Sequence, residues 1–345
     1  MGLSIREIVP RKEISFSELK GKIICVDAFN TLYQFLTTIR QQDGTPLMDS
    51  KKRVTSHLSG ILYRNVALLS EGIKLVYVFD GIPPELKAKT HEMRGAAKDL
   101  ARERYNEAVK EEDIEGMRKY SSSMITLTGE MIEESKELLK AMGIAVIQAP
   151  GEGEAQAAHF TRRSSVYAVG SQDYDSLLFG AKNLIQNLTL SRKKKTFSGW
   201  SEITPELIEL ERVLNTLEIN RDQLICLGIL VGTDYNPKGV PGIGPKKALQ
   251  LVKMYKQPVL IFKAVEEKLM SLSEEDKFDW QEIFSLFYKP EVNEDEFEFG
   301  GVDVDVIKKI LVDKHEFSEE RVEKQIENLL KLQEKKKQKN LERWF

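Results

Sequence analysis

Four apolar runs of strand length recur in the first half of the chain and alternate with helix-compatible stretches. The runs are KIICVDA at 22–28, KLVYVFDG at 74–81, GIAVIQAP at 143–150 and SVYAVGSQD at 165–173. Helical stretches at 56–71 and 128–142 lie between them. Near-continuous apolar strands that alternate with helices are typical of parallel sheets covered on both faces. The pattern therefore predicts an α/β fold with a mostly parallel central sheet and helices on both faces.

The segment from Pro84 to Ser123 has many charges, several alanines and almost no large apolar residues. It is helix-compatible but has a weak core face, so we expect it to stand off the sheet as an arch. Beyond Pro205 the pattern is mainly helical. A capping signature, SEER, starts another helix at Ser318, and this helix dissolves into the lysine-rich stretch EKKKQK after Leu329.

Acidic residues follow every strand-like run. They are Asp27, Asp80, Glu152 with Glu154, Asp173 with Asp175, and Asp234 after a further apolar run at 225–234 that we interpret as a fifth strand end. Ligands of open α/β sheets bind beyond the carboxyl ends of the strands. We therefore expect the seven carboxylates to converge at one edge of the sheet.

Each of these acids has an ordinary explanation by itself, because acidic residues favour helix N-termini and turns. Together they would repel one another, and divalent cations resolve that conflict. Hard ions such as Mg²⁺ prefer carboxylate oxygen and water, whereas no His or Cys is present at these ends to favour zinc. Two Mg²⁺ ions roughly 4 Å apart would activate a water and neutralise a transferring phosphate. The sequence predicts such a site, with Asp173 and Asp175 at the second metal.

Composition places the chain among ordinary globular proteins. It has 345 residues, of which 41% are hydrophobic and 30% are charged. Cys25 and Cys226 lie in apolar runs, which indicates buried thiols in a reducing compartment. No signal peptide is visible, and the apolar run at 224–231 is too short to span a bilayer. We expect a soluble, intracellular protein without membrane contact, cytoplasmic in an archaeon and nuclear in a eukaryote.

The net charge of −3 does not by itself indicate a nucleic-acid-binding protein. Basic residues nevertheless cluster at 87–104, in RKKK at 192–195 and in EKKKQK near the C-terminus. If many acidic residues gather in one pocket, the net charge of the chain can be negative although another face is basic. For any single cluster, a solvated helix face remains the simpler account.

Five motifs, in this order and spacing, resemble those of the flap endonucleases, within the XPG-type structure-specific nuclease family. They are VDAFNTLYQFL, YVFDGIPPELK, PGEGEAQAA, GSQDYDSLLFG and GTDYNPKGVPGIGPKKA. The resemblance implies a mixed α/β nuclease core, a helical gateway over the active site, and incision of 5′ flaps that depends on Mg²⁺, with Mn²⁺ as a substitute. It also implies that Asp27, Asp80, Glu152 and Glu154 serve mainly one metal, and Asp173, Asp175 and Asp234 mainly the other.

The same resemblance assigns roles around the acids. Lys87 and Arg94 would contact the scissile phosphate and stabilise charge in the transition state. Lys98 and Arg102 continue that helix face toward DNA. Tyr33 matches an aromatic residue that stacks on a base, although an ordinary half-buried tyrosine is an equal alternative. Gly2 would also lie at the DNA.

The stretch GVPGIGPKKALQLV resembles a helix–two-turn–helix element that grips one DNA strand with a bound K⁺. Backbone N–H groups of Gly242 and Gly244 could face a phosphate, with charge added by Lys246 and Lys247. The stretch between Asp234 and Gly242 looks archaeal, which leaves the K⁺ ligands open.

Two further segments have a functional and a structural interpretation. Phe317, Glu319 and Arg321 resemble, together with Thr55, a pocket for a short 3′ flap; the alternative is only a capped helix start. The tail resembles a sliding-clamp (PCNA) interaction box, and the alternative is a docked C-terminal helix. The residues of this box are Gln338, Leu341, Trp344 and Phe345.

The sequence as a whole predicts a monomeric flap endonuclease with 5′-3′ exonuclease activity, acting on branched DNA in replication and repair. The alternatives are a related 5′ exonuclease or junction resolvase, and a non-catalytic DNA-binding clamp adaptor. The expected organisation is a nuclease domain at 1–330, with an N-terminal part at about 1–105, a gateway at about 84–130, an internal part at about 131–260 and a helical C-terminal part, then a flexible tail at 331–345.

Overall fold

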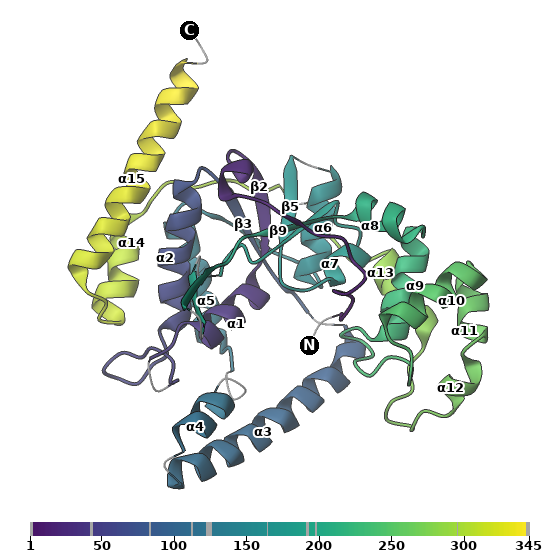
Figure 1. Cartoon of the computed structure of the whole chain (residues 1–345). Coiled ribbons are helices and arrows are strands. Elements are labelled where there is room, and N and C mark those ends of the chain that lie inside the picture. The colour runs from purple at the N-terminus through teal and green to yellow at the C-terminus, as the bar shows by residue number, and fades with distance from the viewer. Residues whose placement is uncertain are drawn as a thin grey trace.

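The computed structural model describes residues 3–41, 44–82, 84–111, 113–121, 126–163, 165–190, 193–196, 199–294 and 296–342. A seven-stranded sheet runs through the centre in the order β1-β9-β6-β5-β2-β3-β4 (Figure 1). The strands are β1 (Lys12–Glu13), β2 (Ile23–Asp27), β3 (Lys74–Phe79), β4 (Ala145–Gln148), β5 (Val166–Gly170), β6 (Asn183–Gln186) and β9 (Glu206–Glu209). Strands β2 to β6 pair in parallel, and β9 and β1 close one edge antiparallel. The predicted fold class is confirmed.

The sheet is buried on both faces because alternate side chains of each strand enter different hydrophobic cores. In β2, Cys25 points to one core, whereas Ile24 and Val26 point to the other. The first core is covered by α6 (Gly153–Arg163), α7 (Asp175–Leu178), α8 (Leu210–Leu217), α9 (Arg221–Val231), α10 (Pro245–Tyr255), α11 (Pro258–Lys263) and α13 (Trp280–Tyr288).

The second core lies on the opposite face of the sheet. Its elements are α1 (Ala28–Thr38), α2 (Ser56–Ser70), α5 (Gly129–Ala141), α14 (Val304–Lys308), the π-helix η3 (Lys309–Lys314) and α15 (Glu319–Glu342). Two short elements complete the body: the 3₁₀-helix η1 (Phe16–Leu19) and the helix α12 (Glu266–Met270). A separate antiparallel hairpin is formed by β7 (Lys193–Thr196) and β8 (Gly199–Glu202).

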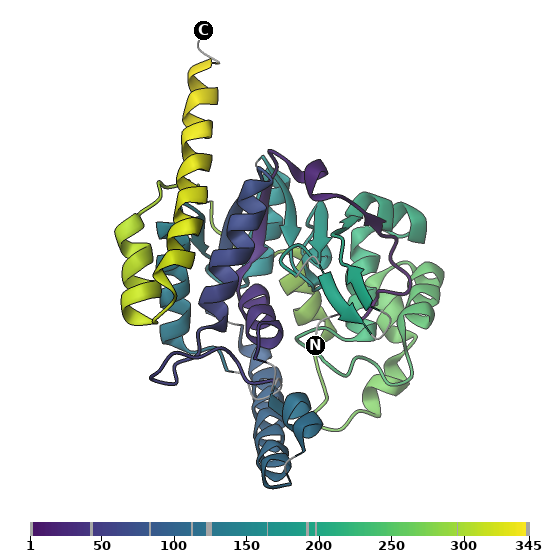
Figure 2. The same ribbon diagram turned by 60° about the vertical axis from the view of Figure 1, so that its left-hand side comes forward.

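The charged segment after β3 forms a helical pair outside the body. It comprises η2 (Glu85–Lys87), α3 (Ala88–Lys110) and α4 (Ile114–Ser121). Helices α3 and α4 pack against each other and extend below the sheet in both views (Figures 1 and 2). The Arg40 guanidinium donates to Ser121 Oγ over 2.7 Å and so joins the end of α4 to the loop after α1.

The apolar run at 225–234 is not a strand, contrary to our interpretation of the sequence. Residues 221–231 form α9, which begins at a capping box between Asn220 and Gln223. This helix is buried all round, so its apolar residues form a continuous run without a polar face. A short apolar run of this kind cannot be assigned to helix or strand from periodicity alone.

Helix α15 also departs from the sequence-based expectation, because it continues through the lysine-rich stretch to Glu342. The expected change to a flexible tail after residue 330 is therefore wrong for the backbone up to that point. Lys, Glu, Gln and Leu all have high helix propensity, and no Gly or Pro interrupts the stretch. The last turns of α15 project away from the body in Figure 2.

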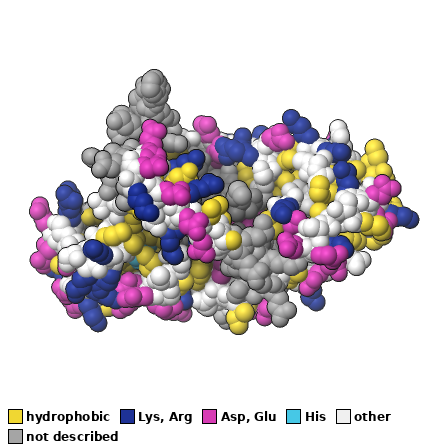
Figure 3. Space-filling model, turned by 90° about the horizontal axis from the view of Figure 1, so that it is seen from below, with side chains coloured by type: hydrophobic (Ala, Val, Ile, Leu, Met, Phe, Trp, Pro, Cys, Tyr) yellow, Lys and Arg dark blue, Asp and Glu magenta, His cyan; other side chains and the backbone are white. Residues whose placement is uncertain are grey.

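Seen from below, basic and acidic side chains are interspersed over the described surface (Figure 3). Hydrophobic side chains gather at the end that carries α10 to α12, where Met254, Val259 and Met270 are exposed. Within the described part of the chain, no helix combines the length and hydrophobicity needed to cross a membrane.

Candidate active site

The parallel strands deliver carboxylates to one edge of the sheet. Asp27 is the last residue of β2, and Asp80 follows β3 directly. Because Asp27 lies opposite Val78 in the register of these two strands, both acids emerge at the same edge. Glu152 and Glu154 lie at the start of α6, which follows the neighbouring strand β4.

A serine hydroxyl joins two of these acids. Ser171 Oγ lies 3.2 Å from Asp27 Oδ2 and 3.0 Å from Glu154 Oε1. Glu154 also accepts a hydrogen bond from Ser176 Oγ over 3.1 Å, and Asp27 accepts one from the N–H of Asn30 over 3.1 Å. These contacts hold both carboxylates while leaving each with spare lone pairs.

The turn at the start of α6 fits closely around Asp80. Gly153 N–H donates to Asp80 Oδ1 over 2.7 Å. A Cβ at position 153 would lie only 2.6 Å from the same oxygen. Gly153, the second glycine of the PGEGEA motif, is therefore required for the close approach of this backbone to the carboxylate of Asp80.

Asp173 lies on the turn between β5 and α7, and Asp175 is the first residue of α7. Asp173 Oδ1 accepts hydrogen bonds from the backbone N–H groups of Leu3, over 3.1 Å, and of Asp175, over 3.3 Å. Asp175 is 4% exposed, and its Oδ1 has no hydrogen-bond partner among the described residues. A buried carboxylate oxygen without a partner is costly unless a cation or water completes it.

Asp234 comes from a rigid turn after α9, not from a strand. Asn236 Oδ1 accepts hydrogen bonds from Thr233 N–H over 3.1 Å and from Thr233 Oγ1 over 2.8 Å, and Asn236 Nδ2 donates to the Ile229 carbonyl over 2.7 Å. Gly239, with φ 58°, closes the turn, where a Cβ would lie 2.4 Å from the carbonyl oxygen of Val231. The turn brings Asp234 Oδ2 to 3.9 Å from Lys87 Nζ.

Crowding raises the pKa values of several of these acids. Burial, followed by the charge of Asp80, raises the pKa of Asp27 to about 7. Burial and the charge of Glu152 raise the pKa of Asp80 to about 6. Burial and neighbouring carboxylates also raise the pKa of Glu154, of Asp173 and of Asp175. The mutual effects show that the acids from separate strands form one electrostatic cluster.

Lys87, from η2 at the base of the gateway, contacts this cluster. Its ammonium group donates to Glu152 and lies 5.5 Å from the centre of the Tyr235 ring. Burial alone would lower the pKa of Lys87, but the charges of Glu152, Asp234 and Asp80 raise it above its ordinary value. The predicted placement of Lys87 beside the acids therefore has direct contacts, whereas the side chain of Arg94 lies outside the described residues.

The acids fit a divalent cation chemically. Among the described residues, no three Asp, Glu, His or Cys side chains are arranged to hold a metal ion as they stand. The side chains nevertheless offer oxygen donors alone. Burial and neighbouring carboxylates raise the pKa of Asp175, and its Oδ1 has no partner among the described residues. A hard cation such as Mg²⁺ would remove the repulsion and complete that oxygen.

The residues predicted to bind DNA differ in exposure. Tyr33 is 36% exposed, and Lys98 Nζ lies 5.8 Å from the centre of its ring. Gly242 and Gly244 are exposed before α10. Arg102, Lys246, Lys247, Glu319 and Arg321 are exposed, Phe317 is half-buried, and Thr55 is buried. Gly2, Trp344, Phe345 and the side chain of Leu341 lie outside the described residues, and Gln338 is exposed on α15.

Sequence reasoning did not single out the hydroxyl groups of Ser171 and Ser176 or the ring of Tyr235, which contact the acids and Lys87. All three lie within quoted motifs, next to or one residue removed from a predicted acid. Their closeness in sequence to the predicted acids was the signal that could have identified them. Which of them contacts a carboxylate depends on the turn geometry, which the pattern does not specify.

Comparison with known proteins assigns the family. The XPG N-terminal domain model matches residues 4–101, and the XPG I-region model matches residues 143–234. Flap endonuclease 1 of Aeropyrum pernix is 48% identical over 354 aligned residues that cover 100% of both chains. The chain belongs to the flap endonuclease 1 family.

Solved structures agree with this membership. Flap endonuclease-1 from Methanococcus jannaschii superposes with a TM-score of 0.76 at 39% identity, covering 97% of this chain and 100% of that one. The catalytic core of Rad2 in complex with DNA substrate gives a TM-score of 0.68 at 25% identity, covering 96% of this chain and 100% of that one. As a member of the flap endonuclease 1 family, the chain is a nuclease, an enzyme of a metal-dependent kind.

Proposed function

We propose that the carboxylate cluster is the active site of a 5′-flap endonuclease that uses two Mg²⁺ ions. The observation that carries this proposal is the electrostatic cluster of acids from separate strand ends, with the Lys87 ammonium group in contact with Glu152. When bound, the metals supply an activated water and neutralise charge on the transferring phosphate. Asp27, Asp80, Glu152 and Glu154 would mainly hold one ion, and Asp173, Asp175 and Asp234 the other.

The chain's own residues would orient the metal-binding carboxylates and neutralise charge on the phosphate. The Ser171 hydroxyl and the Gly153 N–H hold Asp27, Glu154 and Asp80 in place before a metal arrives. Lys87 is poised to move from Glu152 to the scissile phosphate, where Arg94 would join it. The products would carry a 5′-phosphate and a 3′-hydroxyl.

We propose that the substrate is branched DNA with a 5′ flap, recognised by shape and phosphate contacts. The Rad2 catalytic core, a structural relative, is known in complex with DNA substrate. Lys98 beside Tyr33 supports a base-stacking position under the gateway, because base–aromatic stacking tolerates any sequence. Gly242, Gly244, Lys246 and Lys247 would grip the duplex, with K⁺ as a further cation. Phe317, Glu319, Arg321 and Thr55 would form the 3′-strand pocket.

The proposed cellular role is maturation of replication intermediates and DNA repair by an enzyme that is monomeric apart from its clamp. The residues from Gln338 to Phe345 would bind a sliding clamp. In support, the last turns of α15, up to Glu342, project away from the body (Figure 2). The nuclease domain would span 1–330, including the gateway at about 84–130.

One assay tests the proposal against its alternatives. End-labelled 5′-flap, blunt duplex and four-way junction substrates are incubated with the enzyme in Mg²⁺, in Mn²⁺ and in EDTA. Preferential release of the flap in either metal, and none in EDTA, is the expected result. Equal or greater cleavage of the blunt duplex would favour the exonuclease alternative. Preferential cleavage of the four-way junction would favour the junction resolvase. Binding without cleavage of any substrate would favour a clamp adaptor.

A further inference from the structure

The turn that carries Asp173 is held by side chains from other elements. Gln172, the residue before Asp173, donates its N–H to Asn30 Oδ1 of α1 over 3.2 Å. The Gln172 carbonyl accepts a hydrogen bond from Gln186 Nε2, at the end of β6, over 2.8 Å. Both polar backbone groups of Gln172 are therefore bound, and the path of the chain into Asp173 depends on two side chains that are distant in the sequence.

The amide group of Gln186 has a defined orientation. Gln186 is 3% exposed, and its Oε1 accepts a hydrogen bond from Arg6 Nη1 over 3.3 Å. A guanidinium group can only donate, and the Gln172 carbonyl can only accept. The oxygen of the Gln186 amide must therefore face Arg6, and its NH₂ group must face the turn. Arg6 thus fixes which end of the amide reaches Gln172.

Arg6 is itself held by a carboxylate on the neighbouring strand. Its Nη1 and Nη2 donate to Glu206 Oε2 and Oε1 over 2.9 and 3.0 Å, which is a bidentate pair. Glu206 lies opposite Gln186 in the register of β6 and β9, so one guanidinium group contacts both side chains. The Arg6 side chain is 56% exposed, so we expect this ion pair to orient the amide and to add little stability.

The N-terminal segment also contacts the carboxylate of Asp173 directly. The Leu3 N–H donates to Asp173 Oδ1 over 3.1 Å. Leu3 and Ile5 are buried in the first core, and Arg6 follows Ile5 directly. One short segment therefore acts on Asp173 in two ways, through its own backbone at Leu3 and through the Gln186 amide at Arg6.

We propose that Gln186 and Arg6 are positioning residues for the metal site at Asp173. Gln186 holds the backbone ahead of Asp173, and Arg6 holds the Gln186 amide in the orientation that this contact needs. Neither side chain binds the metal itself, because both act through the turn. This inference rests on the proposed function, which assigns Asp173 to a metal ion.

The first measurement is the binding of Mn²⁺ in the absence of DNA, followed by the electron paramagnetic resonance signal of the free ion. Loss of a group that orients a metal ligand typically lowers metal affinity by about 10- to 100-fold. Gln186→Met keeps the length of the side chain and removes both hydrogen bonds. It should weaken Mn²⁺ binding at one site by about tenfold, the lower end of that range, because Asp173 keeps its contact with Leu3.

Arg6→Met separates positioning from a simple effect of charge. Removing a positive charge would by itself strengthen the binding of a cation, whereas loss of positioning weakens it. We expect weaker Mn²⁺ binding, by a smaller factor than in Gln186→Met. The double variant should bind no more weakly than Gln186→Met alone, because both residues act through one contact. Lys12→Met removes the same charge from the same segment, where Lys12 pairs with Glu18 over 3.5 Å, and should not weaken binding.

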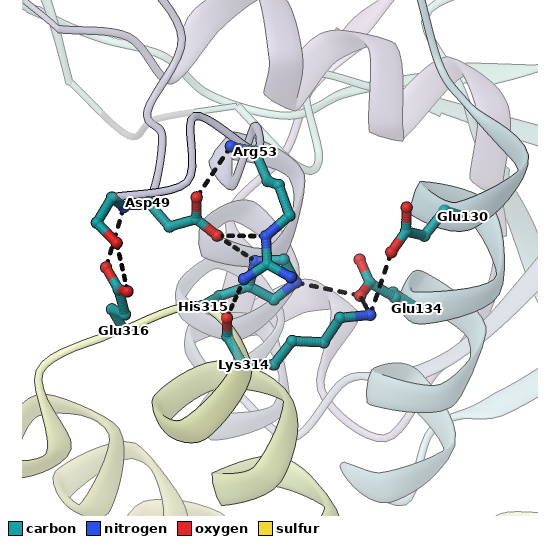
Figure 4. A network of polar contacts seen from close by, with 8 residues as sticks. Asp49, Arg53, Glu130, Glu134, Lys314, His315 and Glu316 are labelled. Carbon is teal, nitrogen blue, oxygen red and sulfur yellow. Dashed lines mark hydrogen bonds and ion pairs between the residues drawn. The ribbon is translucent and has the colours of Figure 1, made fainter.

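The polar network in Figure 4 supplies a control for the loss of stability alone. There Arg53 pairs with Asp49 over 2.7 Å and donates to the Lys314 carbonyl, and Lys314 contacts Glu134 of α5. These contacts join the turns 49–53 and 314–316 to α5, and none of these segments carries a proposed metal ligand. Arg53→Met should therefore lower the melting temperature and leave Mn²⁺ binding unchanged.

The second measurement is the single-turnover rate of 5′-flap cleavage at increasing Mg²⁺ concentration. Gln186→Met should need more Mg²⁺ to reach its half-maximal rate. At saturating Mg²⁺ it should recover most of the unmodified rate, because Asp173 itself is still present. A variant that is only destabilised would instead lose rate at every Mg²⁺ concentration.

The results separate the inference from the proposed function. Mn²⁺ affinity and Mg²⁺ requirement that are both unchanged in Gln186→Met would overturn the inference. Binding that is equal or tighter in Arg6→Met, as in Lys12→Met, would overturn the role of Arg6. If Gln186→Met does not fold, Arg6→Met still tests the contact, because its side chain is more than half exposed. An unmodified enzyme that binds no Mn²⁺ or cleaves no flap would instead contradict the proposed function.

Discussion

At the scale of single residues, the active-site edge concentrates charge that folding would ordinarily avoid. Asp175 is buried with one oxygen that has no partner in the described part of the chain, and burial and neighbouring acids raise the pKa of Asp27 to about 7. Such perturbed groups are typical of functional sites, because their cost to stability is tolerated only where chemistry requires it. Lys87 offsets part of that charge through its contacts with Glu152 and Asp234.

Replacing Asp175 by alanine should abolish flap cleavage and preserve flap binding. The change removes a proposed metal ligand, whereas phosphate contacts elsewhere provide affinity. Since loss of even an outer-shell partner lowers activity by about 10- to 100-fold, we expect a loss of more than about 100-fold in single-turnover rate. Glu137→Ala, an exposed acid on α5, is the control. Appreciable turnover by Asp175→Ala in Mg²⁺ would rule out its role as a metal ligand.

Replacing Lys87 by alanine should reduce the single-turnover rate at saturating enzyme by about a hundredfold, with little change in Kd for flap DNA. Its proposed role is to stabilise charge that develops on the phosphate during the reaction. The exposed Lys182, changed to alanine, provides the matched loss of one positive charge. A weaker Kd with an unchanged rate would reassign Lys87 to substrate positioning.

At the scale of elements, the positions of two proposed metal ligands depend on turns. Asp80 depends on the close approach of Gly153, and Asp234 depends on the turn after α9. That turn is braced by the side chain of Asn236 and by the hydrogen bond from the Val240 N–H to the Leu230 carbonyl, over 2.8 Å. Small changes in these turns should therefore affect catalysis without touching a proposed ligand.

Gly239→Ala tests this dependence. The left-handed conformation costs an L-residue roughly 1–2 kcal/mol, and the added Cβ would also collide with the Val231 carbonyl. We expect a lower melting temperature and a reduced cleavage rate at temperatures where the variant is folded. Gly129→Ala, where a Cβ meets nothing within 4 Å, should leave both unchanged. Equal rates for the two variants would show that the turn does not position Asp234.

At the scale of the whole molecule, the sheet separates two cores. The proposed catalytic acids lie at the carboxyl ends of the parallel strands, whereas α15 packs on the face of the sheet that the second core covers (Figure 1). The gateway helices and the C-terminal end of α15 both leave the body, so each can engage a partner without disturbing either core. Metal binding and clamp binding are therefore expected to be separable properties.

Mg²⁺ should stabilise the folded protein in the absence of DNA. A ligand that binds only the native state at 100 times its Kd adds about 2.7 kcal/mol, and here it would also relieve repulsion among the buried acids. We expect the melting temperature to rise with Mg²⁺ concentration and to return on addition of EDTA. The rise should be smaller for Asp175→Ala. A melting temperature independent of Mg²⁺ would contradict a metal-binding cluster.

Deleting residues 338–345 should leave cleavage of a free flap nearly unchanged and remove stimulation by a sliding clamp. Tethering raises the local concentration of the enzyme at the junction without altering its active site. Trp344→Ala with Phe345→Ala should have the same effect, because aromatic anchors dominate small interfaces. Cleavage is measured with and without loaded clamp. Equal stimulation of full-length and truncated enzyme would exclude the tail as the clamp ligand, and a clearly lower melting temperature would support a docked helix.

The sequence alone determined two features of the sheet. Apolar runs form the strands β2 to β5, and acidic residues follow these runs. These features are local, because a buried strand must be apolar throughout and its end is marked by the first polar residues. The family motifs were also recognisable without a structure. Sequence did not determine that the run before Asp234 is the helix α9, because an all-round buried helix and a buried strand have the same composition.

The tertiary structure decided which distant groups meet. Ser171 lies beside both Asp27 and Glu154, and His315 lies between Asp49 and Glu134, although the partners of His315 lie 266 and 181 residues away along the chain. No periodicity encodes such contacts, because each depends on how turns from separate elements pack.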